Sequence, residues 1–182
     1  NFWEYGNRKN GDFGAHHFDI VQWALQMDDS GPVNYVPAGH NGEPFSYFQY
    51  ANDLKVFKNS DKKRLSINFY GKDGSVHVGR GGKLETTPEN IRATRFKESD
   101  TMLEESRSHR ANWLDCIRSR KQPICHPEVG HRTATICHLL TVAERSGKPV
   151  QWDPAKEELI DATDEQKELT YRKRREGFEL PV

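Results

Sequence analysis

Apolar residues recur at close to helical spacing in three stretches of this chain, which predicts three helices. The first covers residues 14–27, the second covers about residues 102–119, and the third begins after Pro127 and stops at Gly147. The periodic positions of these helices, in the same order, are His17, Ile20, Trp23, Ala24 and Met27; Leu103, Arg110, Trp113, Leu114 and Ile117; and Ile136, Cys137, Leu139, Leu140 and Ala143.

Between Val33 and Glu85 the pattern changes to the alternation that is typical of strands. Leu65–Tyr70 alternates cleanly, and Gly71-Lys72-Asp73-Gly74 is a hairpin signal in front of the next strand. This region predicts one antiparallel sheet of four to six strands. Because strands and helices are grouped separately along the chain, the predicted fold class is α+β, with a largely antiparallel (mixed), open β-sheet and helices packed on one face.

The length suits one domain, residues 1–182, that can enclose a sizeable core. Lysine plus arginine and aspartate plus glutamate both total 27, and this balance argues against nucleic acid and membranes as partners. Charged residues gather near the end, so residues 155–182 are expected to form a charged arm. Cys116, Cys125 and Cys137 lack the spacing of a zinc site and form an odd set, so they are expected to be buried or half-buried thiols.

The start of the first predicted helix combines an acid, small residues and histidines. It reads Gly11-Asp12-Phe13-Gly14-Ala15-His16-His17-Phe18-Asp19, with Asp12 four residues before His16. If the helix begins near Asp12, the two side chains project from one face. A carboxylate beside an imidazole is a usual way to orient a histidine for proton transfer. The plainer alternative is a capping aspartate followed by an exposed histidine.

This segment and residues 116–154 together resemble the Gfo/Idh/MocA oxidoreductases, which act on sugars and cyclitols with a nicotinamide cofactor. The first segment looks like the family's D-x-G-x-H-x-x-D motif. The second, CIRSRKQPICHPEVGHRTATICHLLTVAERSGKPVQWDP, resembles the closing helices of the C-terminal domain, most closely in a bacterial, sugar-associated branch. The resemblance implies that His16 is the acid/base for the substrate hydroxyl or carbonyl, and that Asp12 supports it or contacts the substrate.

A dinucleotide-binding Rossmann fold is not expected within these 182 residues. The only glycine-rich site, Gly79-Arg80-Gly81-Gly82, follows a hairpin strand and precedes no helix, whereas a dinucleotide fold places its glycines between a strand and a helix. By resemblance, the chain is the substrate half of a two-domain enzyme. The full-length protein would use NAD or NADP, and this fragment alone would bind neither tightly.

Four more residues are candidate substrate contacts. His17 would line the pocket or, with equal weight, face the sheet as a hydrogen-bonded core histidine. Tyr5 and Lys9, with Trp3, could bind a polyol by stacking and hydrogen bonds, although Trp3 could equally pack in the core and Lys9 lie in solvent. His131 belongs to Gly130-His131-Arg132, which matches a family pattern, and is expected to approach the pocket.

No metal site is expected among His126, His131 and His138, because they lack the spacing of a recognised ligand set. Asp19 is expected to bind a neighbouring helix or strand. Aromatic residues on both faces of the predicted sheet suggest a partner surface, and in the resembling family the open face commonly forms the oligomer interface. The expected partners are therefore a sugar or polyol substrate and further copies of the chain.

Two other functions stay open from the sequence. One is a non-catalytic carbohydrate-binding or oligomerisation module, and the other is a hydrolase that uses Asp12 and His16 directly.

Overall fold

The computed structural model describes residues 6–58, 66–171 and 174–178, and the chain divides into two compact units. The first unit comprises Asn1–Lys62 and His131–Val182, and the second comprises Lys63–Gly130. The predicted fold class is confirmed, since helices combine with strands whose pairings are all antiparallel. The prediction of a single sheet from Val33 to Glu85 is wrong, because the strands of this region are shared between two sheets.

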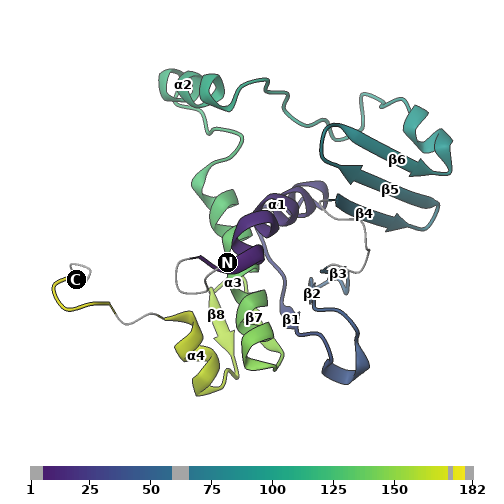
Figure 1. The fold of residues 1–182 in the computed structure, drawn as a ribbon. Helices are drawn as coiled ribbons and strands as arrows, with labels where there is room; N and C mark the ends of the chain where they lie inside the picture. Colours follow the sequence, from purple (N-terminus) through teal and green to yellow (C-terminus); the bar gives the residue numbers. More distant parts are fainter. Residues whose placement is uncertain (1–5, 59–65, 172–173, 179–182) are drawn as a thin grey trace. The chain divides into compact units, whose positions relative to one another are not determined.

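The first unit is built on a five-stranded sheet of order β3-β2-β1-β7-β8 (Figure 1). Its strands are β1 (Asn34–Val36), β2 (Tyr47–Gln49), β3 (Lys55–Phe57), β7 (Val150–Asp153) and β8 (Glu158–Ile160). Its helices are the π-helix η1 (Asn10–Gly14), α1 (Ala15–Ala24), the 3₁₀ helix η2 (His40–Gly42), nearly all of α3 (Pro127–Ser146) and α4 (Asp164–Thr170). Strand β7 pairs with β1, where Val150 lies opposite Tyr35. A strand from late in the chain therefore completes a sheet that begins near residue 34.

The core of the first unit lies between this sheet and helices α1 and α3. Phe18 of α1 packs edge-on against Phe48 of β2, with 5.1 Å between ring centroids. The predicted stripe of α3 is confirmed in full. Its buried members are Ile136, Cys137, Leu139, Leu140 and Ala143. Burial raises the pKa of the Cys137 thiol to about 12, so this cysteine is an inert core residue.

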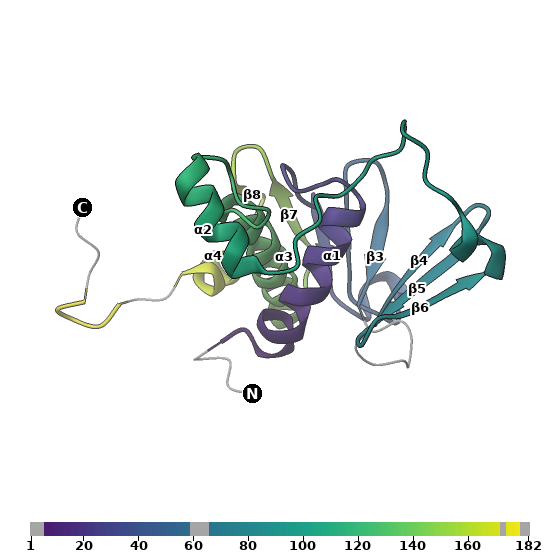
Figure 2. The same cartoon turned by 90° about the horizontal axis from the view of Figure 1, so that it is seen from above.

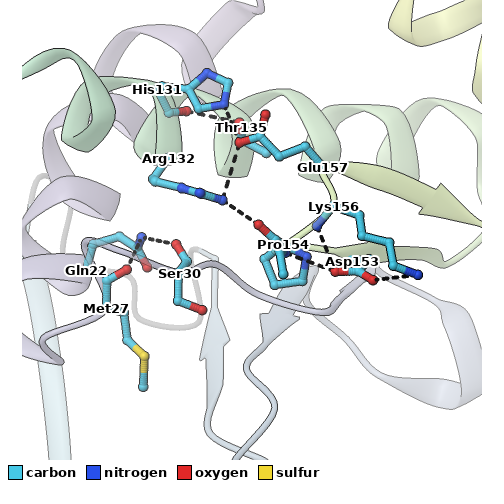
Figure 3. Close-up of polar contacts among 11 residues, drawn as sticks. Gln22, Met27, Ser30, His131, Arg132, Thr135, Asp153, Pro154, Lys156 and Glu157 are labelled. Carbon is cyan, nitrogen blue, oxygen red and sulfur yellow. Dashed lines mark hydrogen bonds and ion pairs between the residues drawn. The ribbon is translucent and has the colours of Figure 1, made fainter.

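Helix α1 buries a different face from the one that the apolar spacing predicted. Phe18, Val21 and Gln22 are its buried residues, whereas Trp23 of the predicted stripe is 40% exposed. The buried face of α1 differs from the predicted one because it includes the polar residue Gln22, and a polar side chain can be buried when it is hydrogen-bonded. Its Nε2 donates to the carbonyls of Met27 (2.9 Å) and Ser30 (3.1 Å) just after the helix, as Figure 3 shows.

The second unit contains a three-stranded sheet of order β4-β5-β6 (Figure 2). Its elements are β4 (Ser66–Gly71), β5 (Gly74–Gly79), β6 (Lys83–Thr87), the 3₁₀ helix η3 (Glu89–Ala93) and α2 (His109–Ser119). The predicted hairpin is confirmed, with Gly71 opposite Gly74. Pairing of Ile67 with Val78 and of Asn68 with His77 gives the sheet one apolar and one polar face. Among the described residues of this unit, His77 alone is buried.

Helix α2 is shorter than the predicted span of residues 102–119, because Ser108 caps it by accepting a hydrogen bond from the Ala111 amide. The predicted apolar stripe of this helix is exposed. Trp113 is 59% exposed, and Leu114 and Ile117 are exposed as well. The spacing of apolar residues correctly indicates an amphipathic helix, but it cannot predict whether another element buries the apolar face.

The range predicted as a charged arm, residues 155–182, is partly built into the first unit. Strand β8 pairs with β7 along Gln151–Asp153, and α4 begins with a capping box formed by Thr163 and Gln166. The buried Gln166 also donates to the Pro149 carbonyl at 2.9 Å. Residues 174–178 are exposed. No helix in the described part of the chain is long and apolar enough to cross a membrane.

Candidate functional site

The predicted acid–histidine motif lies where η1 passes into α1. Asp12 belongs to the π-helical turn, and His16 is the second residue of α1. Both side chains are exposed. A π-helix closes its backbone hydrogen bonds over five residues instead of four, and such single turns occur frequently at functional sites. The turn exposes the Asp12 carboxylate, and the first turn of α1 exposes the His16 imidazole four residues later.

Two glycines allow the chain to form this turn. A Cβ on Gly11 would lie 2.8 Å from the Asn7 Cβ, which is closer than carbon atoms can pack. A Cβ on Gly14 would lie 3.2 Å from Phe18 Cε2 and 3.3 Å from the Lys9 carbonyl oxygen. A side chain at Gly14, between the acid and the histidine, would therefore need the Phe18 ring or the Lys9 carbonyl to move by a few tenths of an ångström.

His16 has two described neighbours on its own segment. The Phe13 ring lies 6.5 Å from the His16 ring between centroids, at an interplanar angle of 54°. Asp19 follows one turn later and accepts a hydrogen bond from Thr133 of α3. Burial raises the pKa of Asp19, while that hydrogen bond and the charge of His16 lower it. The prediction that Asp19 binds a neighbouring helix is confirmed.

In the described part of the chain, no hydrogen bond or ion pair is recorded between Asp12 and His16. The structure therefore brings the two residues into one segment without joining them directly. Lys9 is exposed in the turn just before η1, and His17 is half-buried on α1. Tyr5, together with Trp3, lies outside the described residues.

His131 is exposed and binds the turn between β7 and β8, as Figure 3 shows. Its Nε2 lies 2.7 Å from Glu157 Oε1, an ion pair when the imidazole is protonated. The neighbouring Arg132 donates to the Pro154 carbonyl at 2.6 Å and lies 3.3 Å from Glu157. These contacts fasten α3 to the β7–β8 turn. A substrate-binding role for His131 stays a prediction.

The sequence reasoning missed the buried polar side of the motif. Asn7 and Asn10 are only 6% and 4% exposed, and both donate hydrogen bonds to α3. Their acceptors include Thr141 and Glu144. The only signal in the sequence is the spacing of the two asparagines, three residues apart, directly before the motif.

The glycine-rich segment does not fit the phosphates of a dinucleotide. Gly81 and Gly82 have φ angles of +75° and +77° and connect β5 to β6, where Gly79 lies opposite Lys83. The prediction of a loop is confirmed. A dinucleotide site would instead lead into a helix N-terminus that faces the phosphates. Groups of three or more potential metal ligands are also absent from the residues that the structure describes.

Comparison with known families gives one match. The family model for the C-terminal alpha/beta domain of the Gfo/Idh/MocA oxidoreductase family matches residues 1–180, which is nearly the whole chain. A search of curated proteins and a search of solved structures gave no match.

Proposed function

Because this chain belongs to the Gfo/Idh/MocA oxidoreductase family, as its C-terminal α/β domain, we propose that it is the substrate-binding and catalytic half of a nicotinamide-dependent oxidoreductase. The substrate class is a sugar or cyclitol with a reacting hydroxyl or carbonyl, as in the bacterial, sugar-associated branch that the sequence resembles. The observation that supports this most is the placement of Asp12 and His16. Both are exposed on a turn whose inner side chains are buried.

In this proposal His16 exchanges a proton with the substrate oxygen, and Asp12 contacts the substrate or supports the imidazole. Lys9, exposed just before the turn, would donate hydrogen bonds to sugar hydroxyls, and Tyr5, His17 and His131 are further candidate contacts. NAD or NADP, held by the nucleotide-binding domain of the full-length protein, would exchange the hydride. The C-terminal domain would exchange the proton and bind the substrate.

The test is turnover of the full-length protein with His16→Ala and Asp12→Asn. Loss of a positioned acid/base typically costs roughly 10²–10⁴-fold in rate, so His16→Ala should lower kcat by about that factor with little change in cofactor affinity. Asp12→Asn should act in the same direction, more mildly. His109→Ala, at an exposed histidine at the start of α2, is the matched control. Near-wild-type turnover in both motif variants would contradict the assignment.

A binding experiment on the 182-residue chain tests whether the cofactor is bound by a different domain of the full-length protein. Calorimetry should detect no micromolar binding of NADH, because the glycines at positions 79–82 connect two strands and form no phosphate-binding turn. Clear micromolar binding would contradict the proposal that the cofactor is held elsewhere.

Self-association is the second proposed role, and the second unit supports it. Its sheet leaves Tyr70 78% exposed on the same face as Asn68 and His77. A three-stranded sheet with one buried residue among those described has surface available for a further copy of the chain. This role also fits the alternative of a non-catalytic oligomerisation module, which an inactive full-length protein would favour.

A further inference from the structure

The inner side of the turn that carries Asp12 is held to α3 by side-chain hydrogen bonds. Asn10, the first residue of η1, is 4% exposed. Its Nδ2 donates to Thr141 Oγ1 at 2.8 Å and to Glu144 Oε2 at 3.2 Å. Asn7, one turn earlier, donates from Nδ2 to the Cys137 carbonyl at 2.7 Å. The acceptors at positions 137, 141 and 144 follow helical spacing, so they lie along one face of α3.

Each acceptor for Asn10 is itself held in place. Thr141 Oγ1 donates to the Cys137 carbonyl at 2.8 Å, which leaves its lone pairs for Asn10. Glu144 binds Lys58 Nζ through both oxygens, at 2.7 and 2.9 Å. The side chains of Lys58 and Glu144 are 21% and 26% exposed. A carboxylate has about four acceptor sites, so Glu144 can bind Lys58 and Asn10 together.

The two sides of the turn have opposite character. Asn7 and Asn10 are buried, whereas Lys9, Asp12 and His16 of the same segment are exposed. There is no room for a side chain on Gly11, because its Cβ would lie 2.8 Å from the Asn7 Cβ. The backbone that carries the exposed groups therefore passes close to the buried Asn7 side chain.

We propose that Asn10, bound by Thr141 and Glu144, is a positioning residue that sets the placement of Asp12 and His16 toward the substrate. This inference rests on the proposed function of the motif. The chemical reason is geometric, since misplacement of a reacting group by about 1 Å can cost on the order of 10²-fold in rate. Lys58 acts one step further away, by holding Glu144.

The experiment compares four variants of the full-length protein by kcat, KM and hydrogen exchange of residues 7–16. Asn10→Ala should lower kcat by roughly 10–10²-fold, leave KM for the cofactor unchanged and speed exchange of the segment. Thr141→Val should follow it, because the hydroxyl is lost. Thr141→Ser should restore both rates, because the hydroxyl is kept. Val150→Ala, a buried strand residue, controls for simple loss of stability.

The inference is overturned if Asn10→Ala leaves kcat and exchange unchanged. It is equally overturned if Asn10→Ala changes kcat no more than Val150→Ala does at a temperature where both are folded, or if Thr141→Ser is as impaired as Thr141→Val. Failure of the proposed function would look different. In that case His16→Ala keeps full turnover, while faster exchange in Asn10→Ala still shows that Asn10 holds the turn.

Discussion

Thr133 in α3 donates a hydrogen bond to Asp19 in α1, with 3.3 Å between Oγ1 and Oδ1. Burial raises the pKa of the Asp19 carboxyl, and the Thr133 hydroxyl and the charge of His16 counteract that rise. The bond ties α1 to α3 one turn after the proposed acid/base. It also favours the charged form of a half-buried carboxyl.

Replacing Thr133 by valine should raise the pKa of Asp19 further, because burial then acts without the opposing hydrogen bond. Thr133→Ser keeps a hydroxyl and should leave the pKa close to its native value. Carboxyl-carbon NMR titration of the two variants measures the difference. An unchanged Asp19 pKa in Thr133→Val would show that the hydroxyl does not stabilise the carboxylate.

Two buried tyrosines should respond in opposite ways to loss of the hydroxyl. The Tyr35 hydroxyl is buried without a hydrogen-bond partner among the described residues, and burial raises the pKa of Tyr35 well above its ordinary value. An unsatisfied buried polar group costs about 1–3 kcal/mol, so Tyr35→Phe should raise the free energy of unfolding by about 1 kcal/mol. Urea denaturation measures this change.

Tyr50→Phe is the matched comparison for Tyr35→Phe. The Tyr50 hydroxyl donates to Gln22 Oε1, so its removal deprives a buried acceptor of this donor and should lower the free energy of unfolding by about 1–3 kcal/mol. Equal destabilisation in the two variants would mean that the Tyr35 hydroxyl is satisfied in solution.

Asp153 should make stability depend on pH in the acid range. Backbone hydrogen bonds from Lys156 and Ala155, with the charge of Lys156, lower the pKa of Asp153 below its ordinary value of 3.8. A carboxyl with a lowered pKa stabilises the fold above the unfolded-state pKa, and this contribution is lost as pH falls through the folded-state pKa. Asp153→Asn should therefore be less stable than wild type near neutral pH, and the gap should close in strong acid.

The measurement is urea denaturation of both proteins at about pH 6 and about pH 2, the second well below the ordinary aspartate pKa of about 3.9. The same stability difference at both pH values would contradict a role for the Asp153 charge.

The open sheet of the second unit should take part in self-association. Light scattering at micromolar concentration should show a mass above that of the monomer, and Tyr70→Asp should lower it by placing a charge on the exposed polar face. Tyr171→Asp, at another exposed tyrosine in the first unit, is the control. A strict monomer, or a wild-type mass in Tyr70→Asp, would contradict this interface.

Elements with strong local signals could be predicted from the sequence. Helix α3 has Pro127 at its start, Gly147 after its end and five apolar residues on one face, and all three signals act within a few turns of one helix. The β4–β5 hairpin likewise depends on the glycines of its own turn. The exposure of Asp12 and His16 on one short segment agrees with the local sequence pattern, whereas their proposed catalytic roles stay predictions.

Only the tertiary structure decided which distant segments meet. Strand β7 is four residues long, and its place beside β1 follows from the pairing of Tyr35 with Val150, which no local pattern contains. The hydrogen bonds from Asn10 to Thr141 and Glu144 likewise join residues that lie far apart in the sequence. The sequence by itself determined the types of most elements and the outer side of the motif, because those depend on periodicity and short-range sterics. Long-range packing decides three further features: the division into two sheets, the exposure of α2 and the burial of Asn7 and Asn10 against α3. These contacts join segments far apart in the sequence, so no local pattern predicts them.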